Sequence, residues 1–219
     1  LFAETQRLLK ETEQRANKLA IINNVQQSLA TKLDVQSIYN LVGDTFRELF
    51  NAQVVMISTY DPQSNTIVHR YAIEHDRRVF SPGTHPPGGF RAKIIETQKP
   101  LLVNANVAEE AIRLGQPTLP GTVTPKSWLG VPMLVSDQVI GILSVQNLKQ
   151  ENAFDESDIR LLQAFAASMS IAIENARLYD QARHMAVMDE RQRLGRELHD
   201  SVTQSLDGIS LYAQAAVGK

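Results

Sequence analysis

The chain has 219 residues, 43% of them hydrophobic, which is enough to bury a substantial core. Its 22 Lys and Arg residues nearly balance 24 Asp and Glu residues, and the net charge of −2 excludes the basic footprint of a nucleic-acid binder. The absence of Cys excludes disulfides, thiolate metal sites, iron–sulfur clusters and thioether-linked pigments.

No apolar run approaches the roughly 18 residues of a membrane span, and no signal-peptide pattern is present. We therefore expect a cytoplasmic protein with no membrane segment in this chain. Because the sequence begins with Leu1 and not Met, we expect a fragment of a longer protein. A membrane anchor upstream of it is an open alternative.

Residues 1–31 contain neither Pro nor Gly and are predicted to form one helix, which we assign to a coiled-coil signalling segment over residues 1–33. A seven-residue column supports an imperfect coiled-coil seam; its members are Leu1, Leu8, Arg15, Ile22 and Leu29. Two alternatives follow, a helix packed on its own domain and a helix that pairs with a second copy. The seam favours the dimer.

The middle of the chain alternates helical and strand periods. Asp34 is expected to cap a helix that reaches about Leu49. Further expected elements are a hairpin (52–61 and 66–75), a Pro/Gly loop (81–89), a short helix (90–100), a short strand (101–104), a loop with one helical turn (107–126) and a second hairpin (127–135 and 138–147). From Asp155 a helix of about 60 residues is expected, a length that needs a partner helix. The order predicts an α+β fold, an antiparallel sheet flanked by helices with long helices at both ends.

Residues 34–176 resemble a GAF domain, the widespread small-molecule sensor module. The resemblance rests on "SWLGVPMLVSDQVIGILSVQN" followed by "FDESDIRLLQAFAASMSIAIENARLY". The hairpin with Gly130, Pro132 and Gly141, and then Phe154 and Asp158 at the start of a closing helix, is characteristic of that family. The resemblance implies a sensor domain, which we assign to residues 34–180.

The C-terminal stretch resembles the phosphoacceptor helix of sensor histidine kinases related to nitrate-responsive and membrane-fluidity kinases. That subgroup carries Glu-Arg-x-Arg, then Arg-Glu-Leu-His-Asp, then a Gln four residues after the Asp. The matching residues here are Glu190, Arg191, Arg193, Arg196, Glu197, Leu198, His199, Asp200 and Gln204. The pair Leu194-Gly195 departs mildly from the usual Ile-Ala. Residues 181–219 are therefore assigned to the first helix of a dimerisation and histidine-phosphotransfer domain.

Helical geometry places His199 at the edge of an apolar stripe. The stripe contains Val187, Leu194, Leu198, Val202, Ser205, Ile209 and Tyr212, whereas Arg196, Asp200, Thr203 and Gln204 lie on the other side of the histidine. A neutral imidazole is a good nucleophile for the γ-phosphoryl group of ATP. Asp200 is expected to orient the ring, and Arg196 to offset phosphate charge.

The resemblance further implies that the Gln204 amide positions a water that dephosphorylates a partner's aspartyl phosphate; Thr203 borders the site without an assigned role. Two alternatives to a phosphoacceptor follow from the same residues. His199 could be an ordinary exposed histidine, which the surrounding motif disfavours. A His-Asp metal site needs further ligands, and His184 lies 15 residues away, about 22 Å along the helix, so no metal is expected.

A complete histidine kinase has an ATP-binding domain after this helix, and this chain contains neither its Asn box nor its Gly-rich lid. ATP and Mg are therefore expected in the full-length kinase and not here, and the fragment should be inactive alone. The implied partners are a response regulator receiver domain and a second copy in a parallel homodimer. The alternative is a non-catalytic ligand-binding and dimerisation module; the sequence after Lys219 would discriminate the two.

Seven-residue spacing also links the sensor's last helix to the phosphoacceptor segment through Ile159, Ala166, Ile173, Asp180, Val187 and Leu194. A ligand-driven rotation or tilt of this helix would reach His199 directly. Asp180 interrupts the apolar column. It either sets the register of a bistable joint or pairs at the surface with Arg177 or Arg183.

The sensed ligand is left unknown. Relatives of the GAF family bind cyclic nucleotides, haem, flavin, bilins or metabolites, and a covalent bilin is disfavoured without Cys. Asn147, Lys149, Phe154 and Asp158 resemble a cyclic-nucleotide pattern, but Ile159 replaces its Glu. His69, His75 and His85 could ligate haem, but for each of them an ordinary exposed or hydrogen-bonded side chain is the favoured alternative. His85, in a flexible loop beside the expected pocket, is the candidate for ligand binding. Trp128 is expected in the core, and Tyr60 and Tyr71 either line the cavity or pack.

Overall fold

A computed structural model describes residues 4–6, 20, 23–25, 27–29, 34–74, 77–78, 83–115 and 123–217, without the side chains of residues 200, 201 and 203–217. The chain divides into two compact units, Leu1–Ala176 and Arg177–Lys219. The first unit holds a six-stranded sheet, and the second consists of helix. Each is described by itself.

The sheet of the first unit is antiparallel throughout and has the strand order β3-β2-β1-β6-β5-β4. Its strands are β1 (Val54–Asp61), β2 (Thr66–Glu74), β3 (Arg77–Arg78), β4 (Leu101–Val103), β5 (Ser127–Val135) and β6 (Gln138–Asn147). Both predicted hairpins and the short strand are confirmed. The two-residue β3 at the sheet edge was not predicted, because it is too short to show a period.

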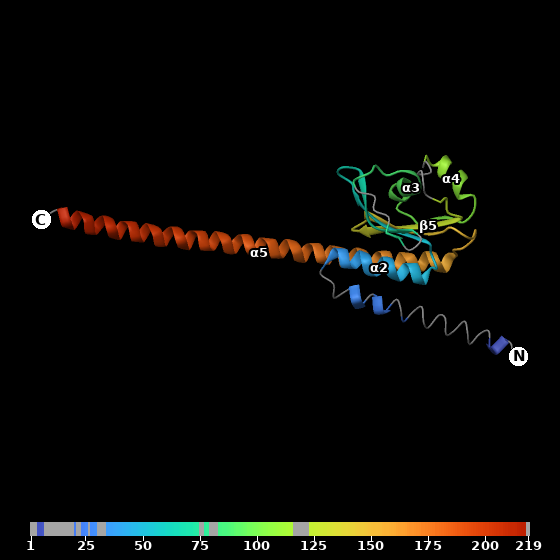
Figure 1. The fold of residues 1–219 in the computed structure, drawn as a ribbon, viewed down its shortest axis with the longest axis horizontal. Coiled ribbons are helices and arrows are strands. Elements are labelled where there is room, and N and C mark those ends of the chain that lie inside the picture. The colour runs from blue at the N-terminus through green and yellow to red at the C-terminus, as the bar shows by residue number, and fades with distance from the viewer. Residues whose placement is uncertain are drawn as a thin grey trace. The chain divides into compact units, whose positions relative to one another are not determined.

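Helices cover both faces of this sheet. Helix α2 (Val35–Leu49) and the first turns of α5 (Glu156–Val217) cover one face, and α3 (Gly89–Thr97) and α4 (Val107–Arg113) lie over the other (Figure 1). The predicted α+β architecture is therefore confirmed. Residues 107–126 were expected to contain one helical turn; α4 is longer, seven residues, with Glu109 and Glu110 in its first turn and Arg113 in its last, favourable positions for these charges.

The larger core lies between the sheet and the α2/α5 layer. Aromatic rings join the layers: the centroids of Phe46 on α2 and Phe165 on α5 are 4.9 Å apart in an edge-to-face arrangement. Val55 and Ile57 of β1 enter this core, so the alternate residues Met56 and Ser58 face the α3 side. Strand β5 has no such alternation and is buried along most of its length, because helices cover it on both faces.

The smaller core lies under α3 and α4. Trp128 is 2% exposed, as predicted for a core residue, and its ring lies 4.9 Å from that of Phe90. A Cβ on Gly130 would lie 2.3 Å from the Trp128 ring, so only Gly fits beneath the indole. This contact gives a physical reason for one of the glycines on which the GAF resemblance rests.

The long helix α5 has 62 residues, which confirms the expected length of about 60. Its start is capped reciprocally. The Asp155 carboxylate accepts hydrogen bonds from the amides of Ser157 (2.7 Å) and Asp158 (3.0 Å), and the Asp158 carboxylate accepts one from the Asp155 amide (3.0 Å). Across the described residues, no helix has the apolar length needed to cross a bilayer.

The predicted N-terminal coiled coil lies largely outside the described residues. Among the described ones, Leu29 is 2% exposed and Val25 is 6% exposed, and both belong to the larger core. At these two positions the segment packs on its own domain, which was the alternative to the dimer. Pairing of two copies through residues 1–33 stays a prediction.

Candidate functional site

The histidine-bearing segment belongs to the second unit and is helical through Val217. The side chains of Arg196, Glu197 and His199 are exposed, as expected for a histidine that a partner must reach. The backbones of Asp200, Thr203 and Gln204 continue α5, but their side chains lie outside the described residues. Their expected roles around His199 therefore stay predictions.

One motif arginine has a structural role that sequence reasoning did not assign. Arg193 donates two hydrogen bonds to the Glu190 carboxylate, from Nη2 (2.7 Å) and Nε (2.9 Å), and a third from Nη1 to Glu197. The spacings of three and four residues place these side chains on one helix face. These ion pairs could have been predicted from the sequence, because a Glu three residues before an Arg and another four residues after it lie beside the Arg on a helix.

The predicted apolar stripe is exposed where its side chains are described. Val187, Leu194, Leu198 and Val202 are 48%, 44%, 67% and 56% exposed. Single exposed apolar residues are ordinary, but a column at helical spacing is a surface that a partner helix would cover. Ser205, Ile209 and Tyr212, the rest of the stripe, lie outside the described side chains.

His184, the nearest other histidine in sequence, has its Nδ1 atom 3.0 Å from the Asp180 carbonyl oxygen on its own helix. The described part of the chain contains no group of three or more His, Asp or Glu side chains that would hold a metal ion.

A second candidate site lies on the sheet face beneath α3. We call it the polar cluster; its members are Met56, Ser58, His69, His85, Arg91 and Gln146. They come from β1, β2, β6, α3 and the segment before α3. Sequence reasoning named only the two histidines, because Arg91 and Gln146 join them through strand order and not through spacing.

His69 is the centre of this cluster. Its Nδ1 atom lies 2.8 Å from the Ser58 hydroxyl, and its ring stacks on that of His85 with centroids 6.1 Å apart. Burial, with smaller contributions from the positive charges of Arg91 and His85, lowers the pKa of His69 to about 4. His69 is therefore neutral near pH 7 and keeps one ring N–H to donate.

The position of His85 corrects one expectation. It was placed in a flexible loop, but its backbone forms an isolated β-bridge with Ile67, with N–O distances of 2.8 and 3.0 Å. The predicted Pro/Gly loop is thus tied to β2 at this residue. The bridge brings His85 beside His69, a pairing that the sequence does not show. His75, the third candidate, lies outside the described residues.

Arg91 is the unusual member. Its Nη2 atom lies 3.1 Å from the Met56 sulfur, and its buried Nε has no hydrogen-bond partner among the described residues. The Gln146 amide points at the same sulfur from 3.7 Å. Burial alone lowers the pKa of Arg91 to about 10, and no described carboxylate offsets that burial. Two strong donors thus converge on a thioether, which is a weak acceptor.

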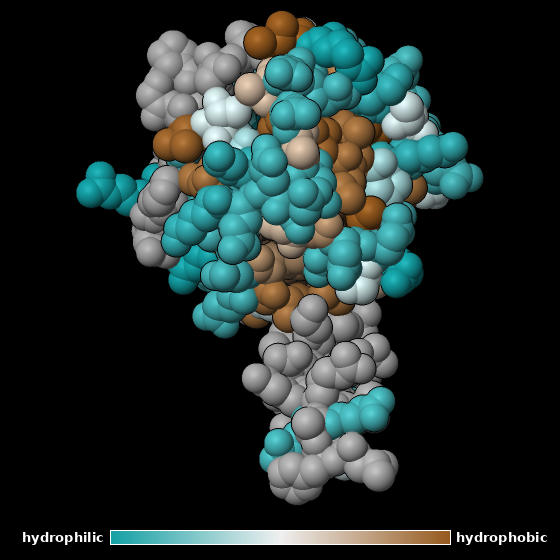
Figure 2. Space-filling view, turned by 90° about the vertical axis from the view of Figure 1, so that its right-hand side faces the viewer, coloured by the Kyte–Doolittle hydropathy of each residue, from teal (hydrophilic) through white to brown (hydrophobic). Residues whose placement is uncertain are grey.

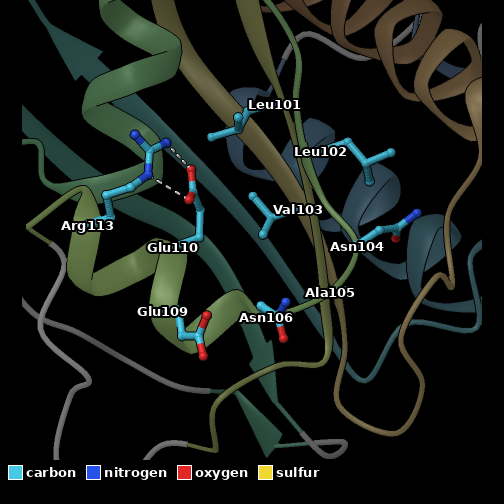
Figure 3. A pocket seen from close by; sticks show the side chains of 9 residues that line it. All are labelled: Leu101, Leu102, Val103, Asn104, Ala105, Asn106, Glu109, Glu110 and Arg113. Carbon is cyan, nitrogen blue, oxygen red and sulfur yellow. Dashed lines mark hydrogen bonds and ion pairs between the residues drawn. The ribbon is translucent and has the colours of Figure 1, made fainter.

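An open pocket of about 480 Å³ lies elsewhere, beside β4 and α4. Figure 3 shows its lining, in which Glu110 and Arg113 already form a bidentate ion pair with each other. It shares no lining residue with the polar cluster. Because Glu110 and Arg113 satisfy each other there, the polar cluster is the better candidate for ligand recognition. Figure 2 shows hydrophilic side chains over most of one face of this unit, with apolar patches between them.

The residues that resemble a cyclic-nucleotide pattern have structural partners. The Asn147 side-chain oxygen accepts hydrogen bonds from the amides of Lys149 and Gln150, both 2.9 Å. Phe154 is buried with its ring facing Phe50, and Asp158 caps α5. The two tyrosines also pack: the Tyr71 hydroxyl donates to Asp44 (2.7 Å), and the Tyr60 hydroxyl donates to Asn65 (3.1 Å).

Comparisons with known proteins agree with this geometry. The chain belongs to the GAF domain family, whose model matches residues 32–174, and residues 190–219 match a histidine kinase family model. A curated relative is the sensor histidine kinase YhcY of Bacillus subtilis (strain 168), 40% identical over 86 residues. That match covers 39% of this chain and 22% of the relative, so the chain spans about a fifth of that protein. Both resemblances drawn from the sequence are confirmed.

Solved structures show the same fold at low identity. A free methionine-R-sulfoxide reductase from Neisseria meningitidis aligns with a TM-score of 0.61 and 16% identity, over 75% of this chain and 92% of that one. A methyl-accepting chemotaxis protein aligns with a TM-score of 0.60 and 19% identity, over 71% and 98%. The GAF domain of an Acinetobacter phosphoenolpyruvate-protein phosphotransferase gives 0.58 and 17%, over 73% and 94%.

Proposed function

We propose that this chain is the sensory part of a two-component histidine kinase, in which a GAF domain over residues 34–180 controls phosphorylation of His199. The observation that carries the proposal is the exposed His199 within a segment matching a histidine kinase family, on the helix that also closes the GAF domain. An exposed imidazole is accessible to ATP held by another domain.

The chemistry assigns a role to each neighbour of His199. Asp200 accepts a hydrogen bond from the ring nitrogen that does not attack, which orients the imidazole and stabilises the cation formed as the phosphoryl group arrives. Arg196 offsets the charge of the phosphoryl group. The Gln204 amide positions the water that later hydrolyses the phosphoaspartate of the response regulator, and Thr203 borders the site. ATP and Mg are supplied by a domain of the parent protein, and the transfer takes place in the cytoplasm.

A parallel homodimer would complete the second unit. The exposed apolar side chains of Val187, Leu194, Leu198 and Val202 follow one another at intervals of seven, four and four residues, which is the pattern that a partner helix covers. In the dimer, a ligand-driven rotation of α5 would change how His199 is presented, with Asp180 as a polar interruption of the seam.

The test is phosphorylation of the parent protein with radiolabelled ATP. We expect label that is stable to base and labile to acid, as a phosphohistidine requires, and its loss in His199→Gln. The matched control is His184→Gln, which changes an exposed histidine on the same helix. Label retained in His199→Gln would contradict the assignment.

A second measurement addresses the fragment by itself. Sedimentation should show a dimer, and Leu198→Glu should weaken it, because the charge would enter the proposed seam. A cross-link that locks α5 near Asp180 without changing the signal response of the kinase would exclude the rotation model.

A further inference from the structure

The polar cluster contains more hydrogen-bond donors than acceptors. Arg91 and Gln146 direct donors at the Met56 sulfur, and the Arg91 Nε is buried with no partner in the described part of the chain. A buried, unsatisfied donor on a cation carries a large desolvation cost. A site of this kind is satisfied when an acceptor, best a negatively charged one, lies between the donors.

The charge around the polar cluster also favours a negatively charged acceptor. The positive charge of Arg91 acts on His69 and is not offset by any described carboxylate. Helix α3 begins at Gly89, two residues before Arg91, and its N-cap Gly88 supplies no side chain to the first amide groups. The positive end of the α3 dipole therefore adds to the field of the guanidinium.

Neutral donors complete the arrangement. Ser58 is 1% exposed and its hydroxyl lies 2.8 Å from the His69 Nδ1, which leaves the other ring nitrogen of His69 for a different partner. The His85 ring stacks on that of His69 with centroids 6.1 Å apart, and the backbone of His85 is held by the bridge to Ile67. An acceptor bound between Arg91 and Gln146 would thus meet a charged fork, an amide and an imidazole.

We propose that the polar cluster binds a small carboxylate or inorganic oxyanion, which accepts hydrogen bonds from the Arg91 guanidinium and the Gln146 amide. The inference rests on the proposed sensory function, since it names the ligand class of that sensor. The Met56 sulfur occupies the acceptor position when the anion is absent. Planar, bidentate recognition of such anions is the particular strength of Arg.

The test is thermal unfolding of the full 219-residue chain with formate, acetate, sulfate or nitrate added as sodium salts, against sodium chloride at equal ionic strength. An anion at one hundred times its Kd should raise the Tm by about 5 °C or more. Stabilisation by formate and acetate alone identifies a carboxylate ligand, and stabilisation by sulfate or nitrate alone identifies an inorganic oxyanion. The absence of any rise beyond chloride overturns the proposal.

Variants separate binding from a purely structural role. Arg91→Met removes the guanidinium and keeps the length of the side chain, so it should abolish the anion-dependent rise while leaving the Tm in anion-free buffer equal or higher, because an unpaired buried charge is gone. If Arg91 were only structural, Arg91→Met would lower the Tm without anion and leave any anion response intact. The control is Arg113→Met, which removes an arginine paired with Glu110 in the other pocket and should leave the anion response unchanged.

These measurements need neither ATP nor phosphorylation of His199. Failure of anion binding with normal labelling of His199 would therefore remove the ligand assignment and leave the kinase function standing. Anion binding without labelling of His199 would remove the kinase function and leave the ligand assignment standing.

Discussion

The Ser58 hydroxyl and the His69 Nδ1 atom lie 2.8 Å apart on neighbouring strands, although they are eleven residues apart in sequence. The β1–β2 register pairs Ser58 with His69 immediately after an irregularity at Ile57, so the pairing depends on that shift. The contact holds a neutral histidine beside Arg91. It makes the sheet face beneath α3 sensitive to protonation.

Stability should fall as the pH is lowered from about 6.5 to 4. The unfolded chain binds a proton at His69 near pH 6.5, whereas the folded chain binds it only near pH 4, so the unfolded state carries more protons in this window. The expected loss is roughly 1–3 kcal/mol by pH 4. Chemical unfolding as a function of pH measures it. His69→Gln should flatten this part of the profile, and His184→Gln, on the exposed helix, should not; equal slopes in all three proteins would contradict the assignment.

Gly43→Ala should destabilise the first unit. A Cβ at this position would lie 2.3 Å from Cε1 and Cζ of Tyr71, and the Tyr71 hydroxyl is held by Asp44. Overpacking of this kind costs about 1–3 kcal/mol, a fall in Tm of several degrees. A double-mutant cycle with Tyr71→Leu supplies the control, because Gly43→Ala should cost less once the ring is absent. Additive losses would show that the ring is not the cause.

Asn104 should be sensitive to a change of a single atom. Its side-chain nitrogen donates to the Phe154 carbonyl oxygen (2.6 Å), and its side-chain oxygen accepts from the Phe154 amide (3.4 Å), which ties the end of β4 to the start of α5. Asn104→Asp replaces the donor with a charged acceptor and should cost about 1–3 kcal/mol at pH 7, more than Asn104→Ala. Acidification to protonate the new carboxyl should restore part of that loss. If the two variants have the same Tm at pH 7, the carboxylate adds no cost beyond the loss of the hydrogen bond, which contradicts this prediction.

Gly195→Ala should stabilise the part of α5 that carries His199. Gly195 lies four residues before His199, in the interior of α5, and a Cβ there meets nothing within 4 Å. Ala is favoured over Gly in a helix interior by about 1 kcal/mol. Amide hydrogen exchange across residues 190–199 should slow in the variant, with exchange in β5 as the internal reference. Unchanged exchange in this segment would mean that Gly195 does not limit its local stability.

Local pattern accounts for what could be predicted of the fold. Strand alternation in β1, the Pro-free run after Asp155 and the Asp34 cap, whose carboxylate accepts from the Ser37 amide at 2.8 Å, are properties of neighbouring residues. The short α4 was underestimated, because seven residues carry too little periodicity to distinguish a helix from a turn. The motif around His199 was recognisable because its residues are close in sequence.

The polar cluster could not be predicted from local sequence pattern. Arg91 and Gln146 are 55 positions apart along the chain. Gln146 reaches Met56 because β6 pairs with β1, and Arg91 reaches it because α3 packs over that face of the sheet. His85 was read as part of a loop because backbone pairing with Ile67 has no local sequence signal. Burial, which makes Arg91 and His69 unusual, is likewise a property of the assembled layers.

The sequence by itself thus determined the class of fold, the long closing helix and the histidine kinase motif around His199, because each depends on short-range periodicity or on a contiguous motif. Only the tertiary structure decided which polar side chains meet beneath α3, and that the buried Nε of Arg91 has no partner among the described residues. Those relationships arise when strand order and helix packing bring distant residues together and remove water from around them.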